Sequence, residues 1–188
     1  NLGNLHKERG EWAAAVVRYR AALAVRPDYD AVQGNLGLAL QQQGQLEEAI
    51  ACFRRVLTLR PGDAVGHNNL GNALRERGEF AAAIGSLRRA VELQPDYAAA
   101  QNNLGKALEE AGQLEEAVGA FRRGVELGLP GGEGPVNLGL GLEKRERHEE
   151  ARAAFRVALE RGVEAAAAGA HMAAATGVAV PEAAPAEH

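Results

Sequence analysis

The feature that most constrains this chain is the tripeptide Asn-Leu-Gly, which returns every 34 residues. It begins at Asn1, Asn35, Asn69, Asn103 and Asn137. A fixed period of this length is typical of stacked helix-turn-helix units, each of which is too small to bury its apolar face without its neighbours. The period therefore predicts an all-α solenoid of stacked antiparallel helix pairs.

Glycine and proline keep the same period and predict where the helices end. A glycine in the left-handed conformation ends a helix and begins the hairpin to the next one, and a proline cannot continue a helix. The glycines are Gly10, Gly44, Gly78 and Gly112, and the prolines are Pro27, Pro61 and Pro95. After a truncated first helix over residues 1–9, the expected helices are 11–25, 30–43, 46–59, 64–77, 80–93, 98–111, 114–127, 136–145 and 148–161.

Other positions that recur every 34 residues, which we call columns, hold small or bulky side chains and identify a family resemblance. One unit carries, at the family's spacing, Leu70, Gly71, Gly78, Ala83, Leu87, Ala90 and Pro95. This pattern resembles the tetratricopeptide repeat over about residues 1–163. The resemblance implies a right-handed α-solenoid, or superhelix, whose first helices line a concave groove, and it implies a protein-interaction scaffold.

The period also divides the chain into units. We expect a partial repeat over 1–29, then repeats 30–63, 64–97, 98–131 and 132–163, a capping helix over 164–176 and a disordered tail over 177–188. In the last repeat Glu146 replaces the turn glycine. At the end of the repeat before it, Leu129 stands in the proline column, Pro130 is displaced by one position, and the glycine-rich residues 131–135 follow, which predicts a looser joint before the fifth unit.

The asparagine column is the candidate site. Asparagine is disfavoured inside helices by up to ~0.7 kcal/mol relative to alanine, so its recurrence needs another cause. A carboxamide offers both a donor and an acceptor, the complement of one peptide group. We therefore expect a peptide-binding ladder along the concave groove, formed by Asn1, Asn35, Asn69, Asn103 and Asn137 with Asn4, Asn72 and Lys106 beside it.

This ladder is similar to the one in the repeat arm of O-linked N-acetylglucosamine transferases, where it holds the main chain of extended substrates. The alternative is that each asparagine bonds a neighbouring helix and is structural. A second use of the fold, a carboxylate clamp for chaperone tails, needs lysine one residue before the asparagine column. Asn68 and Asn102 stand there instead, so the sequence argues against a clamp.

Composition excludes other classes of function. The net charge is −4 and the pI about 5.8, which argues against nucleic acid as a partner. The single cysteine, Cys52, and the widely spaced histidines predict neither a disulfide nor a metal site. We expect no cofactor, no catalytic constellation and hence no enzyme activity in this chain. No run approaches the ~20 apolar residues of a membrane span, and the expected location is cytoplasmic.

Three hypotheses of function follow. The first is a scaffold that binds an extended protein or peptide ligand in its groove. The second is a substrate-recognition arm excised from a larger glycosyltransferase. The third is a self-assembling structural protein, because Leu2 and Leu5 lack a preceding unit to cover them and leave an uncapped end for head-to-tail contact.

Overall fold

The computed structural model describes residues 2–160, apart from the side chains of Leu2 and Glu8, and these residues form α-helices joined by short loops. The predicted capping helix and tail, as well as Asn1, lie outside the described residues. The helices are α1 Leu2–Glu8, α2 Trp12–Val25, α3 Asp30–Gln42, α4 Leu46–Leu59, α5 Ala64–Glu76, α6 Phe80–Leu93, α7 Ala98–Glu110, α8 Leu114–Glu126, α9 Glu133–Glu143 and α10 His148–Glu160. The bounds of α4 and α6 are those that the sequence predicts.

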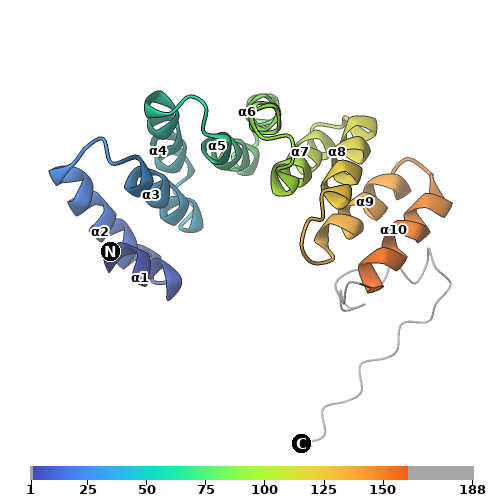
Figure 1. Ribbon diagram of the computed structural model, residues 1–188, viewed down its shortest axis with the longest axis horizontal. Coiled ribbons are helices and arrows are strands. Elements are labelled where there is room, and N and C mark those ends of the chain that lie inside the picture. Colours follow the sequence, from blue (N-terminus) through green and yellow to red (C-terminus); the bar gives the residue numbers. More distant parts are fainter. Residues whose placement is uncertain (1, 161–188) are drawn as a thin grey trace, which may run out of the picture.

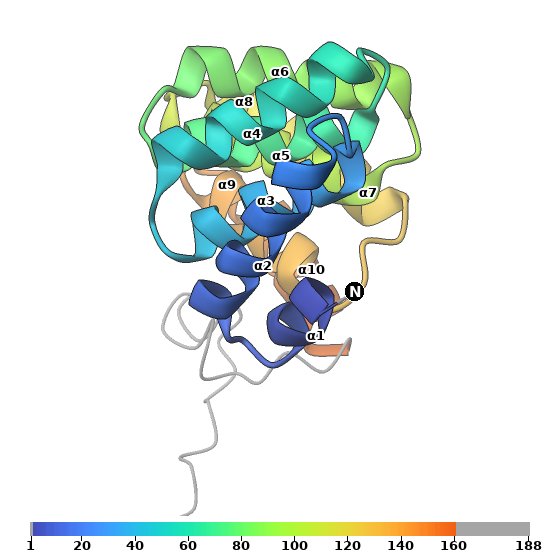
Figure 2. The ribbon, with the colours of Figure 1, turned by 90° about the vertical axis from the view of Figure 1, so that its left-hand side faces the viewer.

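Successive helices form antiparallel pairs that stack side by side into an arch (Figure 1). The odd-numbered helices α3, α5 and α7 lie on the inner, concave side of the arch, and α4 and α6 lie on its outer side. We call α1, α3, α5, α7 and α9 the inner helices. Figure 2 shows the same stacking from one end of the arch. The predicted all-α solenoid is confirmed.

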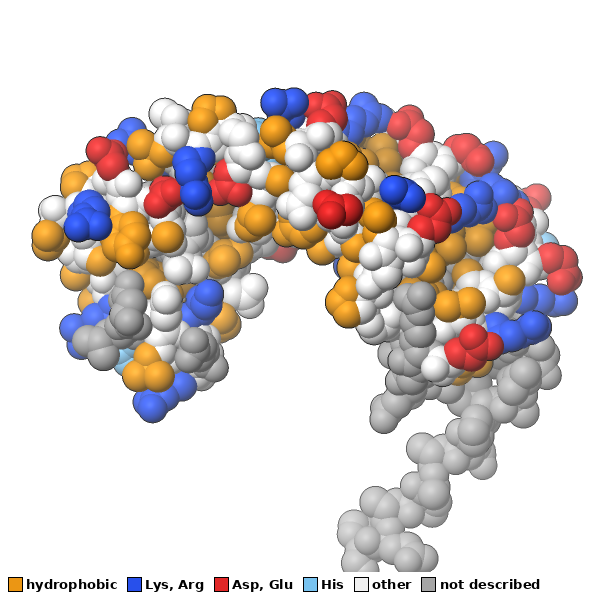
Figure 3. Space-filling view, viewed as in Figure 1, with side chains coloured by type: hydrophobic (Ala, Val, Ile, Leu, Met, Phe, Trp, Pro, Cys, Tyr) orange, Lys and Arg blue, Asp and Glu red, His pale blue; other side chains and the backbone are white. Residues whose placement is uncertain are grey.

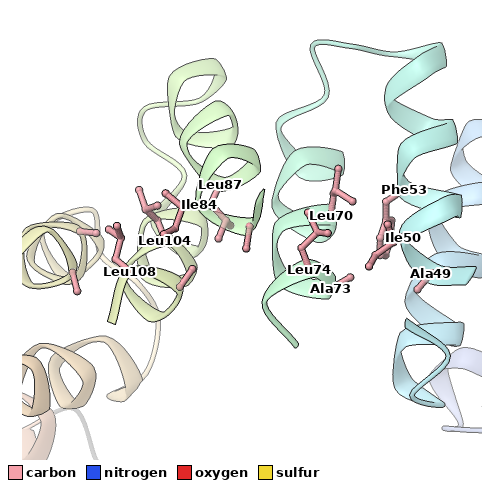
Figure 4. Close-up of a cluster of buried hydrophobic side chains, with 14 of the residues drawn as sticks. Ala49, Ile50, Phe53, Leu70, Ala73, Leu74, Ile84, Leu87, Leu104 and Leu108 are labelled. Carbon is pink, nitrogen blue, oxygen red and sulfur yellow. The ribbon is translucent and has the colours of Figure 1, made fainter. Parts of the chain in front are cut away.

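Each helix pair closes where a glycine of the inner helix meets a bulky side chain of its partner. A Cβ atom added at Gly105 would lie 2.5 Å from Phe121 Cδ1, and one at Gly37 would lie 2.6 Å from Phe53 Cε1. Only glycine admits so close an approach. The apolar cluster continues from unit to unit, since Leu70 and Leu74 of α5 face Ile50 of α4 (Figure 4).

The hairpin turns follow the predicted glycines. Gly10, Gly44, Gly78 and Gly112 have φ values of 72°, 73°, 83° and 78°. Glu146 takes the same left-handed conformation, with φ 58°, between α9 and α10. The fifth unit therefore keeps its hairpin without glycine, at a cost of about 1–2 kcal/mol for the left-handed backbone.

The joint before the fifth unit differs from the prediction in one respect. Helix α9 begins at Glu133, three residues before the predicted start at Val136. Pro135 is accommodated because the first-turn N–H groups of a helix have no partner within the helix. Leu129 is 8% exposed, and a Cβ atom added at Gly134 would lie 3.0 Å from its Cδ2. Leu129 thus joins the packing where other units have proline, and the looser joint stays a prediction.

Candidate functional site

The structure places four of the predicted ladder residues at matching positions of successive inner helices. They are Asn35 of α3, Asn69 of α5, Asn103 of α7 and Asn137 of α9, and each is partly buried. The leucine that follows each of them is buried in the stack. Four residues before Asn69, Val65 is 50% exposed. The inner face of the arch encloses an open hollow (Figure 3).

Two ladder asparagines bond a buried asparagine of the preceding unit. Asn103 Nδ2 donates to Asn68 Oδ1 at 2.8 Å, and Asn137 Nδ2 donates to Asn102 Oδ1 at 3.0 Å. Asn68 and Asn102 are only 6% and 4% exposed. Sequence reasoning missed their role, although both stand directly before a ladder residue. These bonds fix the orientation of the ladder carboxamides and tie consecutive inner helices together.

Asn35 is held differently, because the preceding helix offers other groups. Asn35 Nδ2 donates to Asn4 Oδ1 at 3.3 Å, and Asn4 Oδ1 also accepts from the Tyr19 hydroxyl at 2.8 Å. Lys7 Nζ donates to Asn35 Oδ1 at 3.2 Å. Both ends of the Asn35 carboxamide are therefore engaged, and so is the predicted site residue Asn4.

The remaining predicted site residues lie in the middle of the array. Asn69 Oδ1 accepts a long bond of 3.4 Å from Asn68 Nδ2. Asn72 Oδ1 is buried and has no hydrogen-bond partner among the described residues. Lys106 forms an ion pair with Glu133 of the next inner helix. An acceptor left without a partner lowers the stability of the fold, and an oxygen buried this completely is closed to a ligand in this conformation.

Charged groups near the ends of the inner helices pair across units. Arg75 Nη1 lies 2.6 Å from Glu110 Oε1, and Lys144 Nζ lies 2.7 Å from Glu109 Oε1. Gln41 Nε2 donates to Glu76 Oε1 at 2.7 Å. These contacts neutralise much of the groove charge, which leaves little electrostatic selection of a ligand at physiological salt.

No other chemistry gathers in the part of the chain that the structure describes. Cys52 is 6% exposed, and burial raises the pKa of its thiol to about 11. The described residues contain no cluster of three or more His, Cys, Asp or Glu side chains suited to a metal ion. None of the helices between residues 2 and 160 has the length and hydropathy needed to cross a bilayer.

Comparison with known proteins identifies the repeats. Family models described as "TPR repeat" and "Tetratricopeptide repeat" match residues 1–64, 71–112 and 98–128. No curated protein matches the chain.

Solved structures share the fold. MamA is 25% identical, with a TM-score of 0.76 over 86% of this chain and 94% of that one. PilF of Pseudomonas aeruginosa is 22% identical, with a TM-score of 0.81 over 92% and 80%. YrrB, described as a TPR protein with an unusual peptide-binding site, is 23% identical, with a TM-score of 0.70 over 89% and 87%.

Proposed function

Since the chain is an array of tetratricopeptide repeats, we propose that it is a protein-interaction scaffold that holds an extended segment of a partner against its inner helices. The array supplies a row of carboxamides for the partner's main chain. It carries out no reaction of its own on that partner.

The observation that carries the proposal is the state of the Asn103 and Asn137 side chains. Each donates one N–H to a buried asparagine, and neither Oδ1 accepts a hydrogen bond from a described residue. One acceptor and one further N–H therefore remain on each carboxamide, which is what a peptide group needs. Because the internal bond already fixes the rotamer, less side-chain entropy is lost on binding.

The spacing of the inner helices determines which residues of the ligand contact successive asparagines. Packed helices lie ~8–10 Å apart, and an extended strand advances ~3.3 Å per residue. Successive asparagines would therefore meet about every third residue of the ligand. Each such contact contributes only ~0.5–1.5 kcal/mol net. Recognition of the main chain in this way tolerates many sequences, and tight binding requires several units at once.

The contributions along the ladder are unequal. Lys7 already donates to Asn35 Oδ1, whereas the Oδ1 atoms of Asn103 and Asn137 accept no hydrogen bond from a described residue. We expect the fourth and fifth units to dominate binding.

A test must separate binding from structure, because Asn103→Ala alone leaves Asn68 Oδ1 buried and without its partner. That loss costs about 1–3 kcal/mol of stability. The double variant Asn102→Val, Asn137→Ala removes both partners together, and Val136 shows that valine fits this column. The matched control is Asn102→Val alone, which keeps the groove carboxamide.

The probe is an extended dodecapeptide selected from a random display library on the intact chain. We expect its affinity, measured by calorimetry, to fall at least fivefold in the double variant and less in the control. Methylation of the peptide's main-chain nitrogens should weaken binding in the same way. Equal affinity for the double variant and the control would show that the carboxamides are purely structural.

The other two hypotheses stay predictions. A nucleotide-sugar-binding domain encoded beyond His188 would support the excised glycosyltransferase arm. Light scattering that shows a monomer at all concentrations would exclude head-to-tail self-assembly.

A further inference from the structure

A cavity of about 570 Å³ opens where the third unit begins. Its walls come from the end of α4, the start of α5 and the end of α6, and they include Arg60, Asp63, Val65 and Leu93. A volume of this size lies in the range of ligand pockets. Val65 is 50% exposed and precedes Asn69 by four residues, so the cavity borders the same face of α5 as the ladder.

The repeat explains why the cavity exists in this unit. The residue directly before the inner helix is Tyr29 in the second unit and Tyr97 in the fourth, but Asp63 in the third. In the loop before α3 the Arg26 guanidinium lies over the Tyr29 ring, 5.2 Å from its centroid. Arg60 stands at the position of Arg26, with no ring of its own unit beneath it. The loop before α5 thus keeps the arginine of this pair and lacks the aromatic side chain.

The groups around the cavity are held in place. Asp63 Oδ1 accepts from the backbone N–H groups of Val65 and Gly66 at 3.1 Å each, which caps α5. Arg60 Nε lies 2.7 Å from Asp30 Oδ2. Asp63 Oδ2 lies 3.6 Å from Arg60 Nη2, beyond hydrogen-bonding distance. Burial, and to a smaller extent the Asp63 charge, raises the pKa of the Tyr97 phenol.

We propose that this cavity receives an aromatic side chain of the bound partner, with tyrosine preferred. The inference rests on the proposed function, because the ring belongs to the segment that lies along the ladder. The incoming ring takes the place beneath Arg60 that Tyr29 occupies beneath Arg26, where a guanidinium over an aromatic face is favourable. Val65 and Leu93 cover its edges, and Asp63 Oδ2 accepts its hydroxyl.

The test uses N-acetyl-L-tyrosinamide as the probe and methyl NMR spectra of the intact chain as the readout. We expect saturable shifts at Val65 and Leu93, at least fivefold weaker affinity for N-acetyl-L-leucinamide, and none for N-acetyl-L-lysinamide. Asp63→Tyr should abolish the shifts by filling the cavity. The fold tolerates tyrosine there, since Tyr29 and Tyr97 precede α3 and α7 without a side-chain cap. Asp63→Asn keeps both the cap and the cavity. This variant should bind N-acetyl-L-phenylalaninamide and N-acetyl-L-tyrosinamide with more nearly equal affinity than the wild type does.

A gain of binding provides the second arm of the test. Tyr29→Asp should open an equivalent site beneath Arg26 and produce a second set of saturable shifts at Ala31 and Leu59. The inference is overturned if the tyrosine amide gives no saturable shift on the wild type, if the lysine amide binds better, or if the shifts persist in Asp63→Tyr. Because this probe does not span the ladder, such a failure leaves the groove proposal intact. If the dodecapeptide instead bound the double variant and its control equally while the tyrosine amide still bound the wild type, the result would count against the groove proposal alone.

Discussion

At the scale of the residue, the tightest constraint is a missing side chain. Gly37, Gly71 and Gly105 each face a bulky side chain of the partner helix, at distances where a Cβ atom would clash. Interiors are packed too densely to absorb an added methyl without movement. The glycine of the Asn-Leu-Gly tripeptide is therefore a packing requirement inside a helix, where its propensity alone would be unfavourable.

Two alanine substitutions in the fourth unit test this constraint. Gly105→Ala should lower the free energy of unfolding by about 1–3 kcal/mol, because its Cβ atom would meet the Phe121 ring. A Cβ atom added at Gly119 of α8 would meet nothing within 4 Å. Gly119→Ala should therefore raise the free energy of unfolding by about 0.5–1 kcal/mol. Urea unfolding measures both. Equal effects of the two substitutions would contradict the packing explanation.

Cys52 makes a pH-dependent contribution to stability. Burial raises the pKa of its thiol from 9.0 to about 11. The unfolded chain therefore releases this proton at a lower pH than the folded one, so the contribution is fully present below pH 9 and is lost as the pH rises to about 11. Relative to Cys52→Ala, the wild type should lose about 2–3 kcal/mol over that interval. A constant difference across this range would show that the thiol titrates normally.

At the scale of the element, apolar packing outweighs the ion pairs that join successive units. Arg88 Nη2 of α6 lies 2.6 Å from Glu116 Oε2 of α8, but the two side chains are 50% and 58% exposed. Exposed pairs typically contribute no more than about 1 kcal/mol. Leu104 of α7 is 7% exposed and faces Ile84 and Leu87 of α6 (Figure 4). The contact between the third and fourth units therefore depends more on this leucine than on the ion pair.

Two truncations compare these terms directly. Leu104→Ala should cost about 2–5 kcal/mol of unfolding free energy, through lost burial and the cavity left behind. Arg88→Ala should cost less than about 1 kcal/mol, and raising the salt concentration should shrink that difference further. Chemical denaturation at two salt concentrations measures both effects. A larger cost for Arg88→Ala than for Leu104→Ala would reverse this ranking.

The helices themselves were predictable from the sequence, and the partners of the asparagines were not. Glycine and proline columns act locally, so they predicted α4 and α6 to the residue. The predicted start of α9 at Val136 was wrong, because the first turn of a helix tolerates the proline at position 135. The bond from Asn103 to Asn68 joins residues 35 apart in the sequence, and it depends on how far one helix is offset from the next. No periodicity of residue types reports that offset.

At the scale of the whole molecule, each unit contacts its neighbours along the arch (Figure 1). In such arrays stability is a sum of unit and nearest-neighbour terms. Helices with packed neighbours on both sides should open least often, and α1 has a partner on one side only among the described residues.

Hydrogen exchange should reveal this gradient. We expect the slowest amide exchange in α5, α6 and α7, and faster exchange toward α1, because opening an end unit breaks a single interface. Mass spectrometry of proteolytic fragments measures the rates helix by helix. Uniform protection along the arch would show that the array unfolds as one cooperative body.

The hydrogen bonds between asparagines also constrain which repeats can be duplicated or deleted. Asn69 follows a unit with Gly34 in the acceptor position, whereas Asn103 and Asn137 follow units with Asn68 and Asn102. Duplicating residues 98–131 would give each new copy its matching acceptor and add one hydrogen bond between asparagines of successive inner helices. Deleting residues 64–97 would set Asn103 opposite Gly34 and remove one such hydrogen bond. Duplicating the fourth unit therefore preserves the internal bonding of the array, and deleting the third unit does not.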